Sequence, residues 1–148
     1  MSRALLIFIL TIIINGCSYT PMLTKNYDFQ FSNISSNGER YINEIITNIL
    51  NEKGKGSKKF DIIFNTRQER LVVSSNDKGD AKIYRLSIYV DYEVFQENKK
   101  IIENKFVKYL NYNNINDKFE LSKYEENVIE NLSETISSEI LMSIISMV

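Results

Sequence analysis

The sequence contains no histidine and a single cysteine in 148 residues. Without histidine, the chain lacks the usual general base, the Ser-His-Asp triad and every histidine-based metal site. One cysteine excludes an internal disulfide framework and a Cys-x-x-Cys metal cluster. We therefore expect a protein that is not an enzyme and that uses no cofactor or metal.

An excess of one sign of charge is also missing. Lys and Arg number 18 and Asp and Glu number 19, so the formal net charge is −1. A nucleic-acid-binding domain is expected to be clearly basic, so nucleic acid is not an expected partner. With 43% hydrophobic and 25% charged residues, the composition is that of a folded protein, and the length suits one domain.

The N-terminal segment has the pattern of a targeting signal. Arg3 provides a positive charge, and an apolar run over 4–14 follows, interrupted only by Thr11. Eleven helical residues cover about half of a ~30 Å hydrocarbon core, so this run is too short to span a membrane. Its length fits the hydrophobic region of a secretory signal peptide. The run ends in Ile14-Asn15-Gly16-Cys17.

This ending resembles the lipobox of bacterial lipoproteins: an aliphatic residue, a variable residue, a small residue and then cysteine. The resemblance implies that the Cys17 sulfur receives a diacylglyceryl group and that cleavage leaves Cys17 as an acylated N-terminus. Since each buried CH₂ contributes ~0.8 kcal/mol, several acyl chains make attachment effectively permanent. Ser18 stands where an aspartate would favour the inner membrane, so we expect the outer membrane.

Two other interpretations of this segment are open: an ordinary signal peptide followed by an unrelated cysteine, and a short anchor helix. With lipidation, the chain divides into a lipoprotein signal peptide over 1–16 and a lipidated N-terminus with its tether over 17–26. The remaining residues, 27–148, form a single folded domain.

Four segments have the alternation or the β-rich composition that is typical of strands. In the clearest one, Leu86, Ile88 and Val90 fall on one face, while Tyr89 and Phe95 fall on the other, where a partner surface would need aromatic residues. The predicted strands are 27–34, 60–73 (one long or bulged strand), 81–95 and 100–112.

Two helices are predicted from apolar stripes and from capping-box patterns. The first follows Ser36 and Glu39 and ends at Gly54-Lys55-Gly56. The second begins at Ser122-Lys123-Tyr124-Glu125 and runs to about Met147. The resulting order is β-α-β-β-β-α. We expect an α+β two-layer sandwich in which an antiparallel four-stranded sheet carries both helices on one face.

The segment Cys17-Ser18-Tyr19-Thr20-Pro21-Met22 resembles the mature start of the LptE family of lipopolysaccharide-assembly lipoproteins. The order of elements and the long final helix after an Asn-rich loop are also similar to that family. The resemblance implies a protein that plugs and supports the LptD β-barrel, which inserts lipopolysaccharide into the outer leaflet. It also implies a lipid-anchored position at the cell outer membrane, facing the periplasm and the barrel lumen.

In the family, basic residues in the second-to-third strand loop and near the start of the last helix are associated with lipopolysaccharide binding. The matching positions are Lys78, which Asp77 and Asp80 flank, and Lys123. Phosphates and carboxylates of the ligand would be their partners. The alternative is that both are solvated lysines without a ligand.

Other candidate sites are better explained structurally. The segment 76–80 loosely matches a calcium loop but fits a hairpin turn. Glutamates recur every four residues at 126, 130 and 134, as on a solvated helix face. Lys55, Lys58 and Lys59 form a basic patch that could touch anionic headgroups or merely flank a hairpin. The alternative function is another periplasmic outer-membrane lipoprotein, acting as a chaperone, a pilotin or a cell-wall synthase activator.

Overall fold

The structure is a computed structural model that describes residues 27–147. The signal peptide, Cys17 and the tether therefore lie outside the described residues, as does Val148. The elements are β1 (Tyr27–Gly38), α2 (Arg40–Lys53), β2 (Gly54–Ser75), β3 (Ala81–Gln96), β4 (Lys99–Asn113) and α3 (Lys118–Ile145). The α+β class, the four-stranded sheet and its two helices are as expected from the sequence.

The sheet has the spatial order β1-β2-β3-β4 and is mixed. The three strands β2, β3 and β4 are antiparallel neighbours, but β1 pairs with β2 in parallel. The prediction of a purely antiparallel sheet is therefore wrong. Helix α2 connects β1 to β2 and returns the chain to the end where β1 began, so the second strand must run in the same direction as the first.

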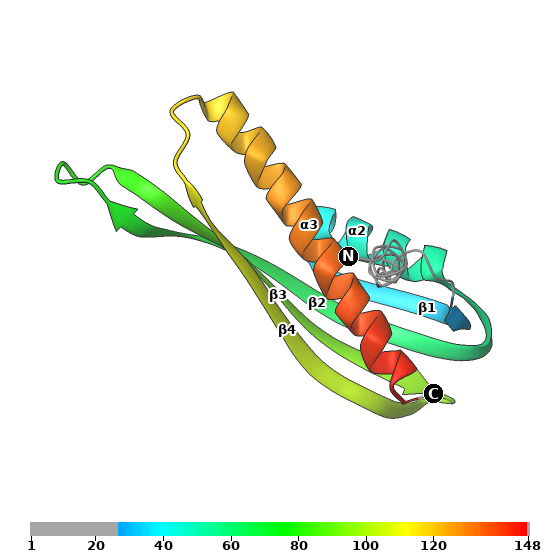
Figure 1. Ribbon diagram of the computed structural model, residues 1–148. Helices are drawn as coiled ribbons and strands as arrows, with labels where there is room; N and C mark the ends of the chain where they lie inside the picture. The colour runs from blue at the N-terminus through cyan, green and yellow to red at the C-terminus, as the bar shows by residue number, and fades with distance from the viewer. Residues whose placement is uncertain (1–26, 148) are drawn as a thin grey trace, which may run out of the picture.

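Both helices lie on one face of the sheet (Figure 1). Strand β3 shows the expected alternation, because Leu86, Ile88 and Val90 are fully buried beneath the helices. Ile46 of α2 and Ile140 of α3 are also fully buried and belong to the same hydrophobic core. Each Å² of apolar surface that is buried contributes about 25 cal/mol of stabilising free energy. This burial holds the two layers together.

Neither capping box forms as predicted. Strand β1 continues through Ser36 to Gly38, and the α2 N-cap, Glu39, makes no side-chain cap. The Glu39 N–H instead donates to Thr66 Oγ1 of the neighbouring strand at 2.9 Å. Gly38 has φ +97°, and a Cβ there would lie 1.9 Å from the Thr66 carbonyl oxygen. Close packing against β2 therefore replaces the local cap.

Helix α3 begins earlier than predicted. The Asp117 carboxylate accepts hydrogen bonds from the backbone N–H groups of Phe119 (2.9 Å) and Glu120 (3.2 Å). Asp117 is thus the N-cap, and Lys123 lies inside the helix. The negative charge of an aspartate at the N-cap also interacts favourably with the positive end of the helix dipole. The neutral Ser122 hydroxyl has no such charge. No helix within residues 27–147 is both long and apolar enough to cross a bilayer.

Candidate functional site

The candidate site is the end of the molecule that lies farthest from the start of β1, which we call the distal end. It consists of the β2–β3 turn with its flanking strand ends (70–84), the β4–α3 loop (114–117) and the first turns of α3 (118–125). Figure 1 shows the β2–β3 hairpin and the start of α3 at the same end of the molecule. Two segments far apart in the sequence therefore meet here.

The β2–β3 turn is organised by one asparagine. Asn76 Oδ1 accepts hydrogen bonds from the N–H groups of Lys78 (3.0 Å) and Asp80 (2.8 Å), and Asn76 Nδ2 donates to the Asp80 carboxylate at 2.9 Å. Gly79 completes the turn with φ +88°. The segment is thus a hairpin turn, and within residues 27–147 no cluster of acidic side chains could hold a metal ion.

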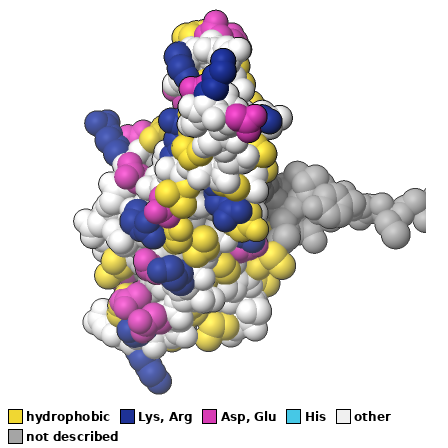
Figure 2. Space-filling view, turned by 90° about the vertical axis from the view of Figure 1, so that its left-hand side faces the viewer, with side chains coloured by type: hydrophobic (Ala, Val, Ile, Leu, Met, Phe, Trp, Pro, Cys, Tyr) yellow, Lys and Arg dark blue, Asp and Glu magenta, His cyan; other side chains and the backbone are white. Residues whose placement is uncertain are grey.

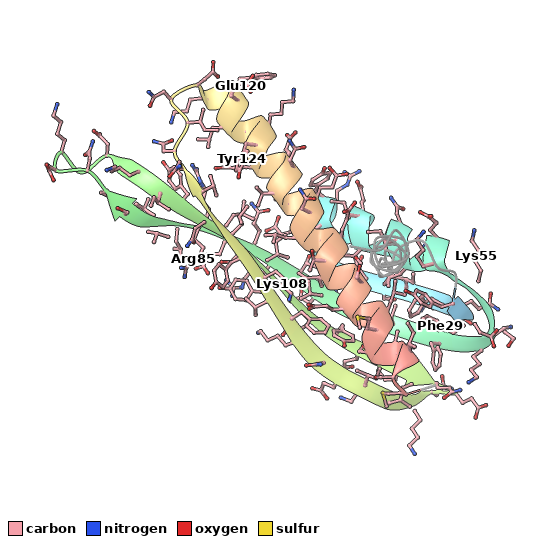
Figure 3. The ribbon with its side chains drawn as sticks, in the orientation of Figure 1. Phe29, Lys55, Arg85, Lys108, Glu120 and Tyr124 are labelled. Atoms are coloured by element: carbon pink, nitrogen blue, oxygen red, sulfur yellow. The ribbon has the colours of Figure 1, made fainter. Side chains whose placement is uncertain are left out.

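Lys78 lies in this turn, between the second and third strands, and its side chain is exposed. Lys123 is exposed as well, but it lies within α3 and not at its first residue. The structure places both lysines at the distal end, on different segments. Figure 3 labels Glu120 and Tyr124 on the first turns of α3, at the same end of the helix as Lys123.

Two further lysines at this end escaped the sequence analysis. Lys82 and Lys118 line a hollow of about 810 Å³ between the hairpin and the β4–α3 loop, together with Asn76, Asp80 and Asn114. The hollow exists because Asn114 joins the two segments: its N–H donates to the Lys82 carbonyl at 2.8 Å and its side-chain amide to the Ala81 carbonyl at 2.9 Å. The Asn-rich composition of residues 111–116 was the signal for this connection.

The four distal lysines are exposed and available. Within residues 27–147, Lys78, Lys82, Lys118 and Lys123 form no ion pair. Acidic residues are nearby, but the Asp80 carboxylate accepts from Asn76 and the Asp117 carboxylate caps α3. The lysine side chains can therefore bind a phosphate or carboxylate without first breaking an internal contact.

A cluster of polar and aromatic residues holds the hairpin to α3. The Arg70 guanidinium lies 3.0 Å from the Glu125 carboxylate and donates to the Tyr112 hydroxyl at 3.2 Å. The Tyr112 hydroxyl donates to Glu125 at 2.5 Å. The same guanidinium covers the Tyr84 ring at 3.9 Å, and the Tyr124 ring packs on Tyr112. We call these five residues the distal cluster.

Burial and the hydrogen bond to Glu125 together raise the pKa of the Tyr112 hydroxyl to about 12, although the hydrogen bond from Arg70 lowers it. The phenol is therefore neutral at physiological pH and acts as a donor to the carboxylate. No sequence pattern indicated this cluster, because Arg70, Tyr112 and Glu125 come from three different elements.

The sheet face opposite the helices is open. It carries Tyr89, with the Arg67 guanidinium 3.8 Å from its ring centroid and its hydroxyl donating to Glu69 at 2.9 Å. Arg85 lies on this face over the Tyr109 ring, whereas Lys108 pairs with Glu139 of α3 on the other (Figure 3). The predicted position of Tyr89 opposite the core is thus confirmed, and Tyr109 of β4 adds a second ring to this face.

Hydrophobic side chains remain exposed on the distal hairpin. Leu71, Val72 and Val73 are successive residues of β2, and each exposes about half of its surface (49%, 55% and 46%). Successive strand residues point to opposite faces, so both faces of the hairpin are apolar and uncovered here. Figure 2, viewed from the side on which the hairpin projects, shows hydrophobic side chains interspersed with basic and acidic ones.

The fold has solved counterparts among bacterial lipoproteins. Rare lipoprotein B from Shewanella oneidensis superposes with a TM-score of 0.60 at 15% identity, over 78% of this chain and 96% of that chain. This chain has the fold of rare lipoprotein B. A lipoprotein from Caulobacter crescentus is also similar in structure to this chain. Its TM-score is 0.54 at 10% identity, over 76% of this chain and 86% of that one.

A protein from Xanthomonas campestris is similar in structure as well. Its TM-score is 0.50 at 7% identity, over 80% of this chain and 87% of that one. No family model matches the sequence, and no curated protein matches it. The likeness to rare lipoprotein B is therefore one of fold. Cys17 lies outside the described residues, so its lipidation stays a prediction from the sequence.

Proposed function

We propose that this protein is an LptE-like lipoprotein, anchored in the outer membrane through Cys17, that plugs and supports an LptD-like β-barrel during lipopolysaccharide assembly. The observation that carries the proposal is the rare lipoprotein B fold, shared over nearly the whole described domain. The lipobox resemblance at Cys17 supports the anchored position. The role is one of binding and support, without catalysis.

The surfaces of the domain suit enclosure by a barrel wall. The open sheet face combines aromatic rings with polar groups, and Val107 and Tyr109 of β4 are 44% and 58% exposed. The distal hairpin adds exposed apolar residues on both of its faces. Exposed apolar surface of this kind is typical of a protein–protein interface.

The distal lysines suit an anionic ligand. Lipopolysaccharide presents phosphates and carboxylates, and Lys78 and Lys123 are exposed with no ion pair within the described residues. Lys118 lies at the first residue of α3, closer to the hollow than Lys123. We therefore extend the proposed lipopolysaccharide-binding residues from Lys78 and Lys123 to include Lys82 and Lys118.

The partner is tested by affinity purification of the tagged full-length protein from detergent-solubilised membranes of the native bacterium. We expect a large outer-membrane β-barrel among the recovered proteins. A Val107→Asp, Tyr109→Glu variant should recover less barrel at unchanged stability, because both side chains are exposed. Recovery of a secretin or a soluble cell-wall synthase in place of an LptD-like barrel would support the alternative function and contradict this one.

The anchor is tested by metabolic labelling with a fatty acid. Cys17→Ser should abolish the label while the domain over 27–148 still folds, because the core seen in the described residues, from Phe29 to Ile144, does not depend on the acyl group. Mass spectrometry of the native protein should show that residues 1–16 are absent and that the sulfur is acylated. An unmodified sulfur would remove the proposed location.

A further inference from the structure

The end of the molecule opposite the distal end brings together cationic and apolar side chains from four elements. We call it the proximal end. It contains the start of β1 and β2, where Tyr27 pairs with Gly54, and the β3–β4 turn at Glu97 and Asn98. The C-terminal end of α3 lies next to that turn in Figure 1. Figure 3 places Lys55 and Phe29 at this end as well.

The cationic residues come from two strands, β2 and β4, which lie on either side of β3 in the sheet. Lys55 and Lys59 are exposed on β2, and Lys99 is exposed at the start of β4. Within residues 27–147 none of these three lysines forms an ion pair. Lys58 and Lys59 also line a hollow of about 460 Å³ with Ser57.

Carboxylates at this end moderate the charge. Asp61 and Glu97 line the same hollow, and Asp28 accepts a hydrogen bond from the Ser57 N–H. Glu52, which pairs with Lys53 at the end of α2, also interacts electrostatically with Lys55. With that pair and Lys58 included, five lysines face four carboxylates. The end therefore has a small positive excess, which favours an anionic surface but gives little affinity without a second attachment.

The apolar residues are at the end of α3. Met142 and Ile145 are three residues apart, so they lie on one side of the helix, and they are 46% and 41% exposed. Met147 follows and is 58% exposed. These three side chains form an exposed apolar surface at the C-terminal end of α3, the end marked C in Figure 1. The unbranched methionine side chains can adapt to a partner surface.

The position of the anchor indicates that the proximal end faces a lipid bilayer. Ten residues, 17–26, separate the lipidated cysteine from Tyr27, and ten extended residues span at most about 35 Å. Strand β3 has 16 residues, so it separates the proximal from the distal turn by roughly 50 Å. The anchor thus keeps the proximal end near the bilayer, whereas the distal end could reach it only if the domain lay flat.

We propose that the proximal end is a phospholipid-facing surface, on which Lys55, Lys59 and Lys99 contact headgroup phosphates and the end of α3 enters the interfacial layer. The proposal rests on the lipidation of Cys17 that the proposed function includes. The acyl chains supply the affinity, and this surface sets the orientation. The domain then stands with its distal end pointing away from the leaflet that holds the anchor.

The test uses the full-length lipidated protein in vesicles of phosphatidylethanolamine and phosphatidylglycerol that contain no other protein. Because Cys17 is the single cysteine and its sulfur is acylated, a thiol-reactive solvatochromic dye labels only an introduced cysteine. One sample carries Met147→Cys at the proximal end. The matched sample carries Asp77→Cys in the distal turn, where the residue is also exposed.

We expect a blue shift of the dye, and quenching by spin-labelled headgroups, at position 147 and neither effect at position 77. Equal responses at both positions, or a response only at 77, would overturn the proposal. Mass spectrometry of the same samples reports the acyl groups on Cys17, and a bare sulfur would overturn the proposal together with the anchor. The barrel experiment is separate, so failure to recover a barrel does not alter this result.

Charge reversal distinguishes the contribution of the lysines to membrane contact from that of the lipid anchor. Lys55→Glu with Lys59→Glu and Lys99→Glu should reduce the quenching at position 147 by about twofold or more and remove its dependence on salt. The control reverses three distal lysines, Lys78, Lys118 and Lys123, and should leave the quenching at 147 unchanged. If both triple variants behave alike, the proximal lysines do not contact the headgroups. Circular dichroism before reconstitution confirms that each variant is folded.

Discussion

The covered part of the sheet and the distal end are built in different ways. Where the helices cover the sheet, Ile88 of β3 and Ile136 of α3 are fully buried. On β4, Lys100, Lys105 and Lys108 are all in ion pairs, on one face of the sheet or the other. At the distal end, the strands extend past the helices, and the lysines form no ion pair within the described residues. The first region secures the fold, while the second leaves its lysines and several apolar side chains exposed.

The means of attachment differ as well. The covered part is held by apolar burial spread over many residues, so no single polar contact decides its stability. The distal hairpin is joined to α3 through the few residues of the distal cluster. Loss of one of those contacts should therefore loosen the hairpin locally before it affects the whole domain.

The largest expected effect is in the covered core. Ile136→Ala should lower the free energy of unfolding by about 2–5 kcal/mol, because Ile136 is 0% exposed and the change leaves a cavity. Leu71→Ala, at 49% exposure on the distal hairpin, is the control and should cost less than about 1 kcal/mol. Urea unfolding followed by circular dichroism measures both, and equal losses would contradict the proposed difference between the regions.

The next effect concerns the distal cluster. Arg70→Ala should lower the free energy of unfolding by about 1–3 kcal/mol, because it leaves Glu125 without its cation and Tyr112 without a donor. Amide hydrogen exchange should accelerate in the distal hairpin more than in the covered part of β3. Arg67→Ala, on the open face, is the matched control, and faster exchange throughout both variants would argue against a local role.

A smaller effect should appear at high pH. Burial and the hydrogen bond to Glu125 raise the folded-state pKa of Tyr112 to about 12 from the ordinary value of 10.0. Between these two values the unfolded chain has released the proton while the folded protein keeps it, so the free energy of unfolding falls as the pH rises. Tyr112→Phe should be less stable near neutral pH and should lose less stability from pH 10 to pH 12. An unchanged slope would show that Tyr112 does not carry this dependence.

The smallest effect on stability belongs to the distal lysines. Lys78→Glu with Lys123→Glu should leave the thermal unfolding temperature unchanged, because both side chains are exposed and form no ion pair within the described residues. The same variant should bind lipopolysaccharide more weakly in a direct binding assay. Lys105→Gln is the control for the binding assay, because it removes a positive charge from the open face and not from the distal end. Equal affinity of the double variant would remove both lysines from the proposed site.

Much of the fold could be predicted because its signals are local. The period-two pattern around Leu86 and Val90 predicted the buried face of β3, and the apolar stripe around Ile42 and Ile46 predicted α2. The start of α3 was misplaced because the prediction followed the capping-box pattern at Ser122 and Glu125. The Asp117 side chain caps the helix five residues earlier, at the end of the loop that follows β4.

The amino-acid sequence by itself determined the helices, the strands and which face of each is apolar, because these depend on residues a few positions apart. It also predicted Lys78 in a turn, which the structure confirms, and a lipobox at Cys17, which stays a prediction. Only the tertiary structure decided the parallel pairing of β1 with β2 and the assembly of Arg70, Tyr112 and Glu125. Those features join residues far apart in the chain, and their contacts form only when the sheet and the helices pack together.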